Sequence, residues 1–213
     1  MIEDWTLDEL VAAHAAGRLP LPLALIIGSH LALSPESRAA HDAFEVAGGV
    51  LREQIEPAPL GPGAWERLAQ RLADPAPALA DPLPEALRHL PPPLRHHIPG
   101  SLDRLPWKRM GSISEAVLDL GTPGYRTSLI RVRAGKAVPQ HTHEGHELTL
   151  VLEGSFHDAL GRYGRGDLAI TDSTVTHQPR ADEGQDCLCL AVTDARLRLT
   201  GPFGRLLNPF IRH

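Results

Sequence analysis

Residues 135–154 constrain the fold of this chain more than any other stretch, because they carry a His-x-His-x3-Glu pattern between two glycines. His141 and His143 are two residues apart, so on a β-strand both side chains project from one face. Glu147 shares that parity, but on a straight strand it would lie about 13 Å beyond His143. Metal–ligand bonds are about 2 Å long, so these residues can bind one ion only if the chain reverses at Glu144-Gly145. The pattern therefore predicts two strands joined by a tight turn.

A fourth candidate ligand, His177, follows a Gly166-Asp167 turn and a further strand-like run. With the three residues above it completes a set of three imidazoles and one carboxylate. Such a set suits zinc when the site is closed, and iron, manganese, nickel or copper when open coordination positions remain. His146 competes with these residues for ligation. The spacing thus predicts a metal site and leaves the metal open.

Beyond Trp107, short runs rich in Val, Ile, Leu and Thr alternate with glycine-containing turns, over residues 125–132, 148–152, 167–171, 187–193 and 195–199. This spacing predicts an all-β barrel or sandwich. Cys187 and Cys189 are two apart on one run and should face one way. They are either small core hydrophobes or an oxidant-sensitive pair near the metal, which would require thiolate character. Two cysteines cannot form a disulfide framework, which favours a reducing cytoplasm.

The first 74 residues predict helices instead of strands. A capping box from Thr6 to Glu9 precedes one apolar run, and Gly17 stands where that helix would stop. A helix over residues 21–33 is apolar nearly all round, which implies burial. Ser34-Pro35 supplies an N-cap and a first-turn proline for a third helix that reaches about residue 56, and a fourth covers residues 64–73. The expected core side chains of this half are Ile26, Ile27, Leu31 and Phe44.

Residues 75–99 contain eight prolines. Such a stretch predicts a semi-rigid spacer with at most one short helix, over residues 84–90, and it forms the natural domain boundary. The expected fold is therefore multi-domain, α plus all-β. It consists of a small helical bundle over residues 1–74, a linker over 75–99, a metal-binding β-domain over 100–200 and a C-terminal tail over 201–213 to which no chemistry is assigned.

Charge is unevenly distributed along the chain. The formal net charge is −5, yet residues 1–56 hold nine acidic and only three basic residues. A surface of this sign repels phosphate, so direct nucleic-acid binding is not expected, and it would attract a basic protein partner. No apolar run approaches the roughly 18–20 residues of a membrane span, and the first residues lack the basic region of a signal peptide. These features predict a cytoplasmic protein without membrane contact.

The metal pattern resembles the first cupin motif, G-x5-H-x-H-x3-E-x6-G, at every fixed position. The second cupin motif is reduced to the Gly166-Asp167 turn and His177, without its usual downstream Asn. The resemblance covers about residues 105–200. It implies that the β-domain is a cupin barrel, or double-stranded β-helix, with a metal held by His141, His143, Glu147 and His177.

A second resemblance lies in the helical half. His30, Ser34 and Ser37, followed by Gly48-Gly49, resemble the zinc-binding anti-sigma domain, which carries H-x3-C-x2-C at these positions and a further His near the N-terminus. The order of anti-sigma domain, Pro-rich linker and cupin is that of the ChrR family. Here serines replace both cysteines, and residues 1–13 contain no His. Serine hydroxyls are poor zinc ligands because they do not ionise near neutral pH. We therefore expect no zinc in the helical half, with His30 a partly buried helix residue and Ser34 an N-cap.

The family resemblance implies an anti-sigma factor. Its residues 1–74 would sequester an extracytoplasmic-function sigma factor, and its cupin would sense an oxidant such as singlet oxygen or peroxide. A helical remnant that only solubilises or dimerises the cupin is an alternative, and a homodimer through the cupin stays open. The rival is a metal-dependent cupin enzyme, such as a small-molecule dioxygenase or isomerase, with Glu144, His146 or Asp158 as acid or base. The residues identify no substrate, sigma partner or signal.

Overall fold

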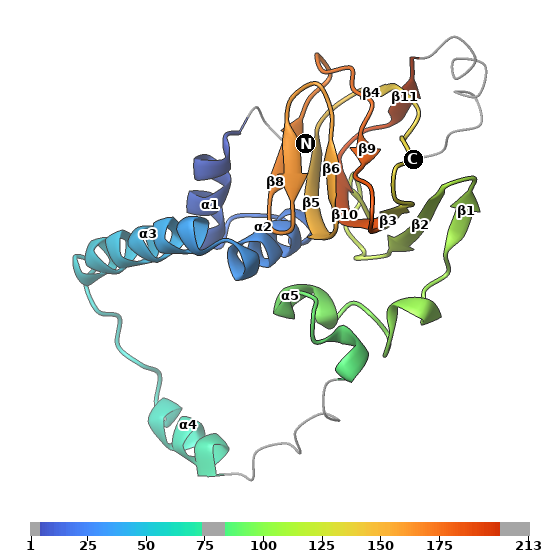
Figure 1. Ribbon diagram of the computed structural model, residues 1–213. Coiled ribbons are helices and arrows are strands. Elements are labelled where there is room, and N and C mark those ends of the chain that lie inside the picture. Colours follow the sequence, from blue (N-terminus) through green and yellow to red (C-terminus); the bar gives the residue numbers. More distant parts are fainter. Residues whose placement is uncertain (1–4, 74–83, 201–213) are drawn as a thin grey trace.

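The computed structural model of the protein describes residues 5–73 and 84–200. Helices occupy the N-terminal part and strands the C-terminal part (Figure 1). The helical elements are α1 (Leu7–Ala15), α2 (Leu21–Leu33), α3 (Pro35–Glu53), α4 (Ala64–Ala73), the 3-10 helix η1 (Glu85–Leu87), α5 (Pro92–Arg95) and the 3-10 helix η2 (Leu102–Arg104). The strands are β1 (Lys108–Met110), β2 (Ile113–Leu118), β3 (Arg126–Val132), β4 (His141–His143), β5 (Glu147–Glu153), β6 (Ser155–His157), β7 (Arg162–Gly164), β8 (Leu168–Thr171), β9 (Arg180–Ala181), β10 (Cys187–Thr193) and β11 (Leu197–Leu199). The predicted tail and residues 75–83 of the predicted linker lie outside the described residues.

Local sequence signals set the helix boundaries as predicted. The Thr6 side chain accepts a hydrogen bond from the backbone N–H of Glu9, and the Glu9 carboxylate accepts one from the backbone N–H of Thr6. Gly17 follows α1 with a positive φ of 64°, a conformation that costs glycine little. At the start of α3 the Ser34 side chain accepts from the backbone N–H of Ser37. The helices therefore begin and end where capping chemistry places them.

The strands form a cupin-like β-domain of antiparallel sheets. The largest sheet has the order β1-β2-β3-β10-β5-β8, and two smaller sheets contain β11-β4 and β7-β6-β9. β10 lies between β3 and β5 and is antiparallel to both. The five predicted runs correspond to β3, β5, β8, β10 and β11. The sequence analysis did not predict β1, β2, β6, β7 and β9. All of these except the six-residue β2 have only two or three residues, which carry too little periodicity.

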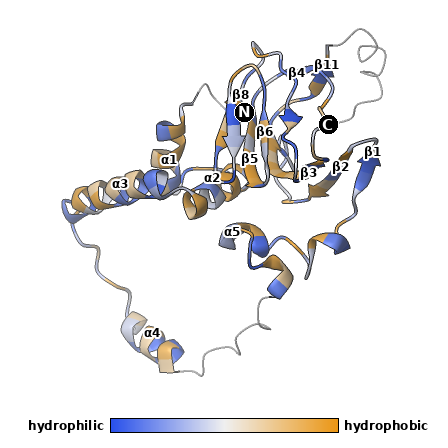
Figure 2. Ribbon diagram, viewed as in Figure 1, coloured by the Kyte–Doolittle hydropathy of each residue, from blue (hydrophilic) through white to orange (hydrophobic). Residues whose placement is uncertain are grey.

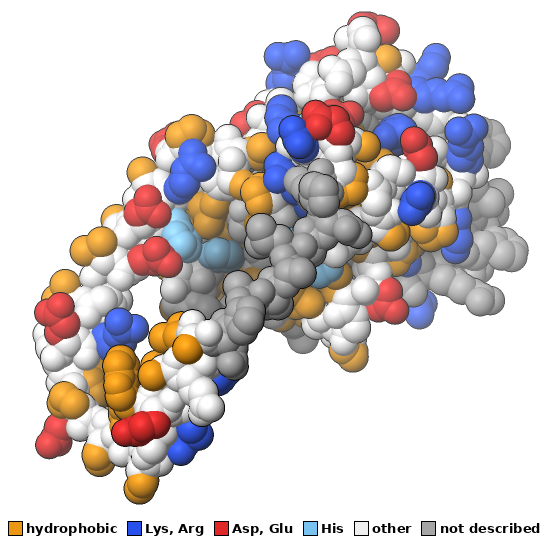
Figure 3. Space-filling view, turned by 90° about the horizontal axis from the view of Figure 1, so that it is seen from below, with side chains coloured by type: hydrophobic (Ala, Val, Ile, Leu, Met, Phe, Trp, Pro, Cys, Tyr) orange, Lys and Arg blue, Asp and Glu red, His pale blue; other side chains and the backbone are white. Residues whose placement is uncertain are grey.

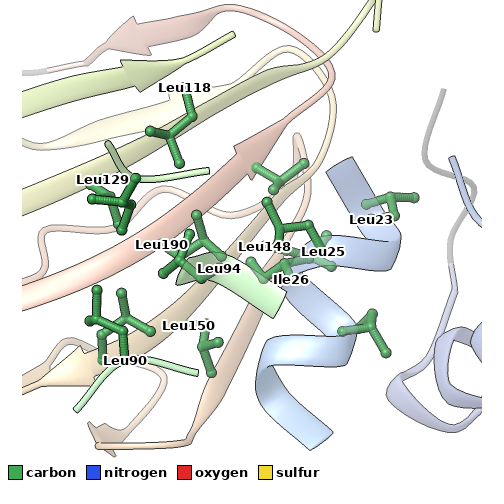
Figure 4. Close-up of a cluster of buried hydrophobic side chains, with 14 of the residues drawn as sticks. Leu23, Leu25, Ile26, Leu90, Leu94, Leu118, Leu129, Leu148, Leu150 and Leu190 are labelled. Atoms are coloured by element: carbon green, nitrogen blue, oxygen red, sulfur yellow. The ribbon is translucent and has the colours of Figure 1, made fainter. Parts of the chain in front are cut away.

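The helices and the large sheet share one hydrophobic core. Alternate residues of β5 divide between two clusters: Leu148, Leu150 and Leu152 pack with the helices, whereas Val151 packs with Cys187 in a second cluster. Figure 4 shows α2 side chains meeting the sheet at the centre of the shared core. The residues labelled there are Leu23, Leu25, Ile26, Leu90, Leu94, Leu118, Leu129, Leu148, Leu150 and Leu190. The helical part and the β-domain are therefore joined by burial of apolar surface.

The proline-rich segment does not act as a spacer over residues 84–99. Leu87, Leu90 and Leu94 are fully buried and belong to the shared core. Two short helical elements form here, η1 and α5, instead of the single one predicted. The reason is that Leu87, Leu90 and Leu94 recur at helical spacing between the prolines: the prolines restrict the backbone, and the leucines anchor it to the sheet.

One predicted core residue is exposed. Ile26, Ile27 and Leu31 are buried as predicted, but Phe44 is 40% exposed. Within residues 42–73 only Ala64 is not exposed. We call residues 42–73 the arm; it comprises most of α3, the connection after it and α4. The apolar stripe of α3 is present, but the burial predicted for Phe44 is wrong, because α1 and α2 pack only against the first part of α3 and its apolar side chains from Phe44 onward are exposed.

The arm projects from the rest of the molecule and ends in α4 (Figure 1). Its hydropathy alternates between apolar and polar faces along both helices (Figure 2). The space-filling view shows hydrophobic side chains exposed over this projecting part (Figure 3). The large apolar side chains concerned are Phe44, Val46, Val50, Leu51, Ile55, Leu60, Trp65, Leu68 and Leu72. Among the helices that the structure describes, none is both long enough and apolar enough to span a membrane.

Candidate metal centre

The predicted chain reversal places three of the candidate ligands together. His141 and His143 lie at the two ends of β4, and Glu147 is the first residue of β5. The turn between these strands contains Gly145, where a Cβ would come within 2.8 Å of the Ala195 side chain. A side chain at this position would therefore force the neighbouring loop to move, which explains why the turn requires glycine.

His177 joins the three from a different part of the chain. It forms an isolated antiparallel bridge with His141: the backbone N–H of each donates to the carbonyl of the other, at 3.1 and 3.0 Å. All four side chains are buried, and their ligand atoms lie within 4.8 Å of one another. The structure thus brings together the four predicted ligands in one cluster that can hold a metal ion.

The distances inside this cluster suit a shared ion. His141 Nε2 lies 3.1 Å from His177 Nε2, and His143 Nε2 lies 3.2 Å from the Glu147 Oε2. Two ligand atoms bound to one tetrahedral zinc, each at about 2.1 Å, are separated by roughly 3.3 Å. The four side chains therefore have the spacing of a first coordination shell.

Hydrogen bonds orient two of the imidazoles from behind. His141 Nδ1 donates to the carbonyl of Pro139 at 2.8 Å, and His177 Nδ1 donates to the carboxylate of Asp158 at 2.9 Å. These bonds fix the tautomer and leave each Nε2 as a lone-pair donor facing the cluster. A carboxylate behind a histidine is the arrangement that commonly supports a metal-bound imidazole.

His143 gives an independent reason to place a metal here. Its ring is buried; among the described residues Nδ1 has no hydrogen-bond partner, and Nε2 faces only the Glu147 carboxylate, at 3.2 Å and without hydrogen-bond geometry. A buried polar atom without a partner costs about 1–3 kcal/mol. An ion bound to Nε2 would remove that cost, so the donor set fits a metal.

The electrostatics keep His141 and Glu147 in their metal-binding protonation states. Burial lowers the pKa of His141 to about 4 and so holds its ring neutral. Burial acts to raise the pKa of Glu147, but His143 and the other two histidines outweigh it and hold this pKa at about 2. Neutral imidazoles and an ionised carboxylate are the forms that bind metals.

Comparison with known proteins shows the family of this chain. Residues 97–195 match the model of the ChrR cupin-like domain. The anti-sigma-E factor ChrR of Cereibacter sphaeroides is 38% identical over 210 residues, which cover 96% of each chain. This chain belongs to the ChrR family of anti-sigma factors. The crystal structure of Rhodobacter sphaeroides SigE in complex with the anti-sigma ChrR matches it with a TM-score of 0.73 and 36% identity, over 91% of this chain and all of that one.

The ChrR-family assignment leaves no catalytic role for the residues that the enzyme hypothesis had proposed. The family consists of regulators, and Asp158 is engaged behind His177. Glu144 is exposed and lies 3.7 Å from Arg198. His146 is close to Asp194, at 3.8 Å, and is not part of the ligand cluster.

The degenerate zinc motif of this ChrR-family chain is occupied by a hydrogen-bond network. His30 Nδ1 lies 2.8 Å from the carbonyl of Gly166, so Nδ1 carries the proton. His30 Nε2 then accepts from the Ser37 hydroxyl at 2.8 Å, and the Ser34 hydroxyl donates to Ser37 at 3.2 Å. His30 is fully buried instead of partly buried as predicted. It links α2 to the turn before β8, so the motif here joins helices to cupin.

The cysteines face the same way, as predicted, with their sulfur atoms 3.6 Å apart. Both lie in the second cluster, beside Val151. The hydrogen bond with Cys187, together with burial, raises the pKa of Cys189 well above its usual value. Because thiolate is the reactive form, these surroundings favour the packing role, and a redox role stays a prediction.

Proposed function

We propose that this chain is a cytoplasmic anti-sigma factor: the arm and the neighbouring helices bind an extracytoplasmic-function sigma factor, and the cupin metal site senses an oxidant. The observation that carries the proposal is the arm. Its apolar side chains are exposed in a chain that aligns over most of its length with an anti-sigma factor crystallised with its sigma factor.

The arm requires a partner on energetic grounds. Trp65, Leu68 and Leu72 lie three and four residues apart on α4 and form one stripe, of which Trp65 is 65% exposed. An isolated helix of ten residues is marginally stable in water. A partner that covers the stripe would supply the missing burial, in the manner of an amphipathic helix laid into an apolar groove.

Charge supports a protein partner over a nucleic acid. Residues 1–56 carry nine acidic and three basic residues. This surface repels phosphate and favours a basic protein surface. The sigma factor would therefore meet apolar contacts along the arm, with an acidic surround that speeds association.

The two functions are coupled physically through β5. Glu147 begins this strand and faces the metal cluster, whereas Leu148, Leu150 and Leu152 on its other face pack into the core shared with α2. His30 adds a second connection, at the turn before β8, which pairs with β5. A change of metal ligands thus acts on the packing under the helices, and it alters the free energy of the sigma complex.

We propose zinc as the metal. Three imidazoles and one carboxylate, all buried, match a closed site. Iron, manganese, nickel and copper are outcomes that metal analysis of the purified chain would distinguish.

The proposal is tested with the full chain and a cognate extracytoplasmic-function sigma factor, co-expressed and separated by gel filtration. We expect a stable one-to-one complex with the natural chain. Replacing Trp65, Leu68 and Leu72 by alanine should dissociate it, whereas replacing Glu66, Arg67 and Arg71 on the opposite face should not. Unchanged binding of the apolar variant would show that the arm is not the docking surface.

The division of roles is tested separately. Glu147→Ala with His177→Ala should leave sigma binding largely intact and abolish release of the sigma factor by singlet oxygen or peroxide. Loss of sigma binding in this variant, with the helices still folded by circular dichroism, would refute the sensor role of the cupin.

A further inference from the structure

A second histidine pair lies at the base of the arm, outside the cupin and outside the degenerate zinc motif. His14 of α1 and His41 of α3 approach with Nδ1 of the first 3.0 Å from Nε2 of the second. Their ring centroids are 5.0 Å apart and the ring planes are inclined by 59°. The metal-site pair His141 and His177 has almost the same geometry, with nitrogens 3.1 Å apart and rings inclined by 58°.

Polar groups also lie on the far side of each ring. His14 hydrogen-bonds to the carbonyl of Ala24, and its Nε2 lies against Gly28, where a Cβ would stand only 3.2 Å away. The absence of a side chain at Gly28 therefore makes room for the ring. Nδ1 of His41 lies 3.8 Å from the carboxylate of Asp42. Carbonyl and carboxylate partners of this kind orient metal-bound imidazoles.

A carboxylate, that of Glu45, lies close to His41, and its charge acts to raise the pKa of His14. Glu45 follows His41 by four residues, which places both on one face of α3. The ligand atoms of His41, Asp42 and Glu45 lie within 4.8 Å of one another. His41 is only 14% exposed, whereas Asp42 and Glu45 are open to solvent, so an ion can enter. Figure 3 shows histidine and acidic side chains side by side on this face of the molecule.

We propose that His14, His41 and Glu45 bind a divalent transition-metal ion of the zinc class, which ties α1 to the base of the arm. Two imidazoles and one carboxylate are a ligand set that zinc uses, with a fourth position left to water. Burial lowers the pKa of His14, which favours its neutral, metal-binding form. When the ion binds, the His41 proton moves from Nε2 to Nδ1, next to Asp42, and the hydrogen bond between the two rings is replaced by two metal–nitrogen bonds.

This site is independent of the sigma-binding proposal. It uses none of His30, Ser34 and Ser37, but it departs from the expectation from sequence that the helical half holds no zinc. The ion would link α1 to α3 at a place other than the degenerate zinc motif. Because α3 carries the arm, the ion would fix the angle between α3 and α1.

The test is the zinc stoichiometry of the full chain. The protein is stripped with a chelator, loaded with excess zinc chloride, desalted, and analysed by plasma mass spectrometry. We expect two ions per natural chain, and one in His14→Gln and in His41→Gln. His96→Gln, a variant of an exposed histidine outside both clusters, serves as the matched control and should keep two.

A second variant distinguishes loss of metal binding from loss of folding. Glu45 is exposed, so Glu45→Gln should leave the circular dichroism spectrum unchanged while weakening the second ion at least tenfold in a competition titration. Zinc should also slow hydrogen exchange of the α1 amides in the natural chain and not in Glu45→Gln. Equal stoichiometry in all the variants, or zinc affinity unaffected by Glu45→Gln, would overturn the proposal and leave a hydrogen-bonded histidine pair.

Discussion

Two helical regions of this chain both carry apolar side chains and differ in where the folded molecule places them. α2 is buried on nearly all sides, between α1, α3, α5 and the cupin sheet. The arm, by contrast, exposes almost every residue from 42 to 73. Both carry apolar side chains at helical spacing. We infer that α2 stabilises this chain, whereas the apolar surface of the arm has no intramolecular role among the described residues and is available to a partner.

The largest expected effect is a difference in unfolding free energy between a substitution on α2 and one on the arm. Ile26→Ala on α2 should lower the free energy of unfolding by about 2–5 kcal/mol, because it leaves a cavity in the shared core. Leu72→Ala on the arm, where the side chain is 73% exposed, should change it by less than about 0.5 kcal/mol. Urea unfolding of the free chain measures both, and equal losses would contradict the comparison.

Lowering the pH should reduce the free energy of unfolding through the cupin metal site and not through the arm. Below its ordinary pKa of 6.5 an unfolded histidine binds a proton, whereas His141, with a pKa of about 4, does not. The unfolded state therefore binds more protons between these values, and stability falls as the pH falls. In the metal-free chain the loss from pH 7 to pH 4 should be about 3 kcal/mol.

Urea unfolding at several pH values measures this loss. Glu147, with a pKa of about 2, extends it below pH 4.5. The variant His141→Gln should show a much shallower pH dependence above pH 4.5, and an undiminished slope would assign the effect to other groups.

Removing the carboxylate that hydrogen-bonds to His177 should lower the metal affinity of the cupin without changing sigma binding by the arm. Asp158→Asn replaces the carboxylate that accepts from His177 Nδ1, and metal affinity should fall roughly 10- to 100-fold. Glu144→Gln, at an exposed carboxylate beside the site, is the control. Competition with a chromophoric chelator gives the affinities, and sigma binding should be the same in both variants.

The smallest effect concerns the point where the two regions meet. Ser34 caps α3 and also donates to Ser37, which hydrogen-bonds to His30. Ser34→Ala should cost about 1 kcal/mol of stability, as loss of an N-cap does. Thermal unfolding measures this, and hydrogen exchange should increase in the first turn of α3 but not in α4. An exchange increase spread over the arm would show that the arm folds as one unit with its cap.

Elements whose signals are local could be predicted from the sequence. The capping box of Thr6, the N-cap of Ser34 and the turn at Gly145 act within a few residues, so the helices and the reversal at the metal site follow from nearest neighbours. The four ligands were also predictable, because His141, His143 and Glu147 have the spacing of a known motif. His14 and His41 were missed because they are 27 residues apart and match no motif.

Only the tertiary structure decided which apolar surfaces are covered. Phe44 and Ile26 both lie on apolar stripes, yet one is exposed and the other buried. The prolines of residues 84–99 predicted a spacer, yet Leu87, Leu90 and Leu94 fasten that segment to the sheet. Periodicity states that a face is apolar. Whether an element lies against that face depends on contacts between residues far apart in the chain, which no local pattern contains.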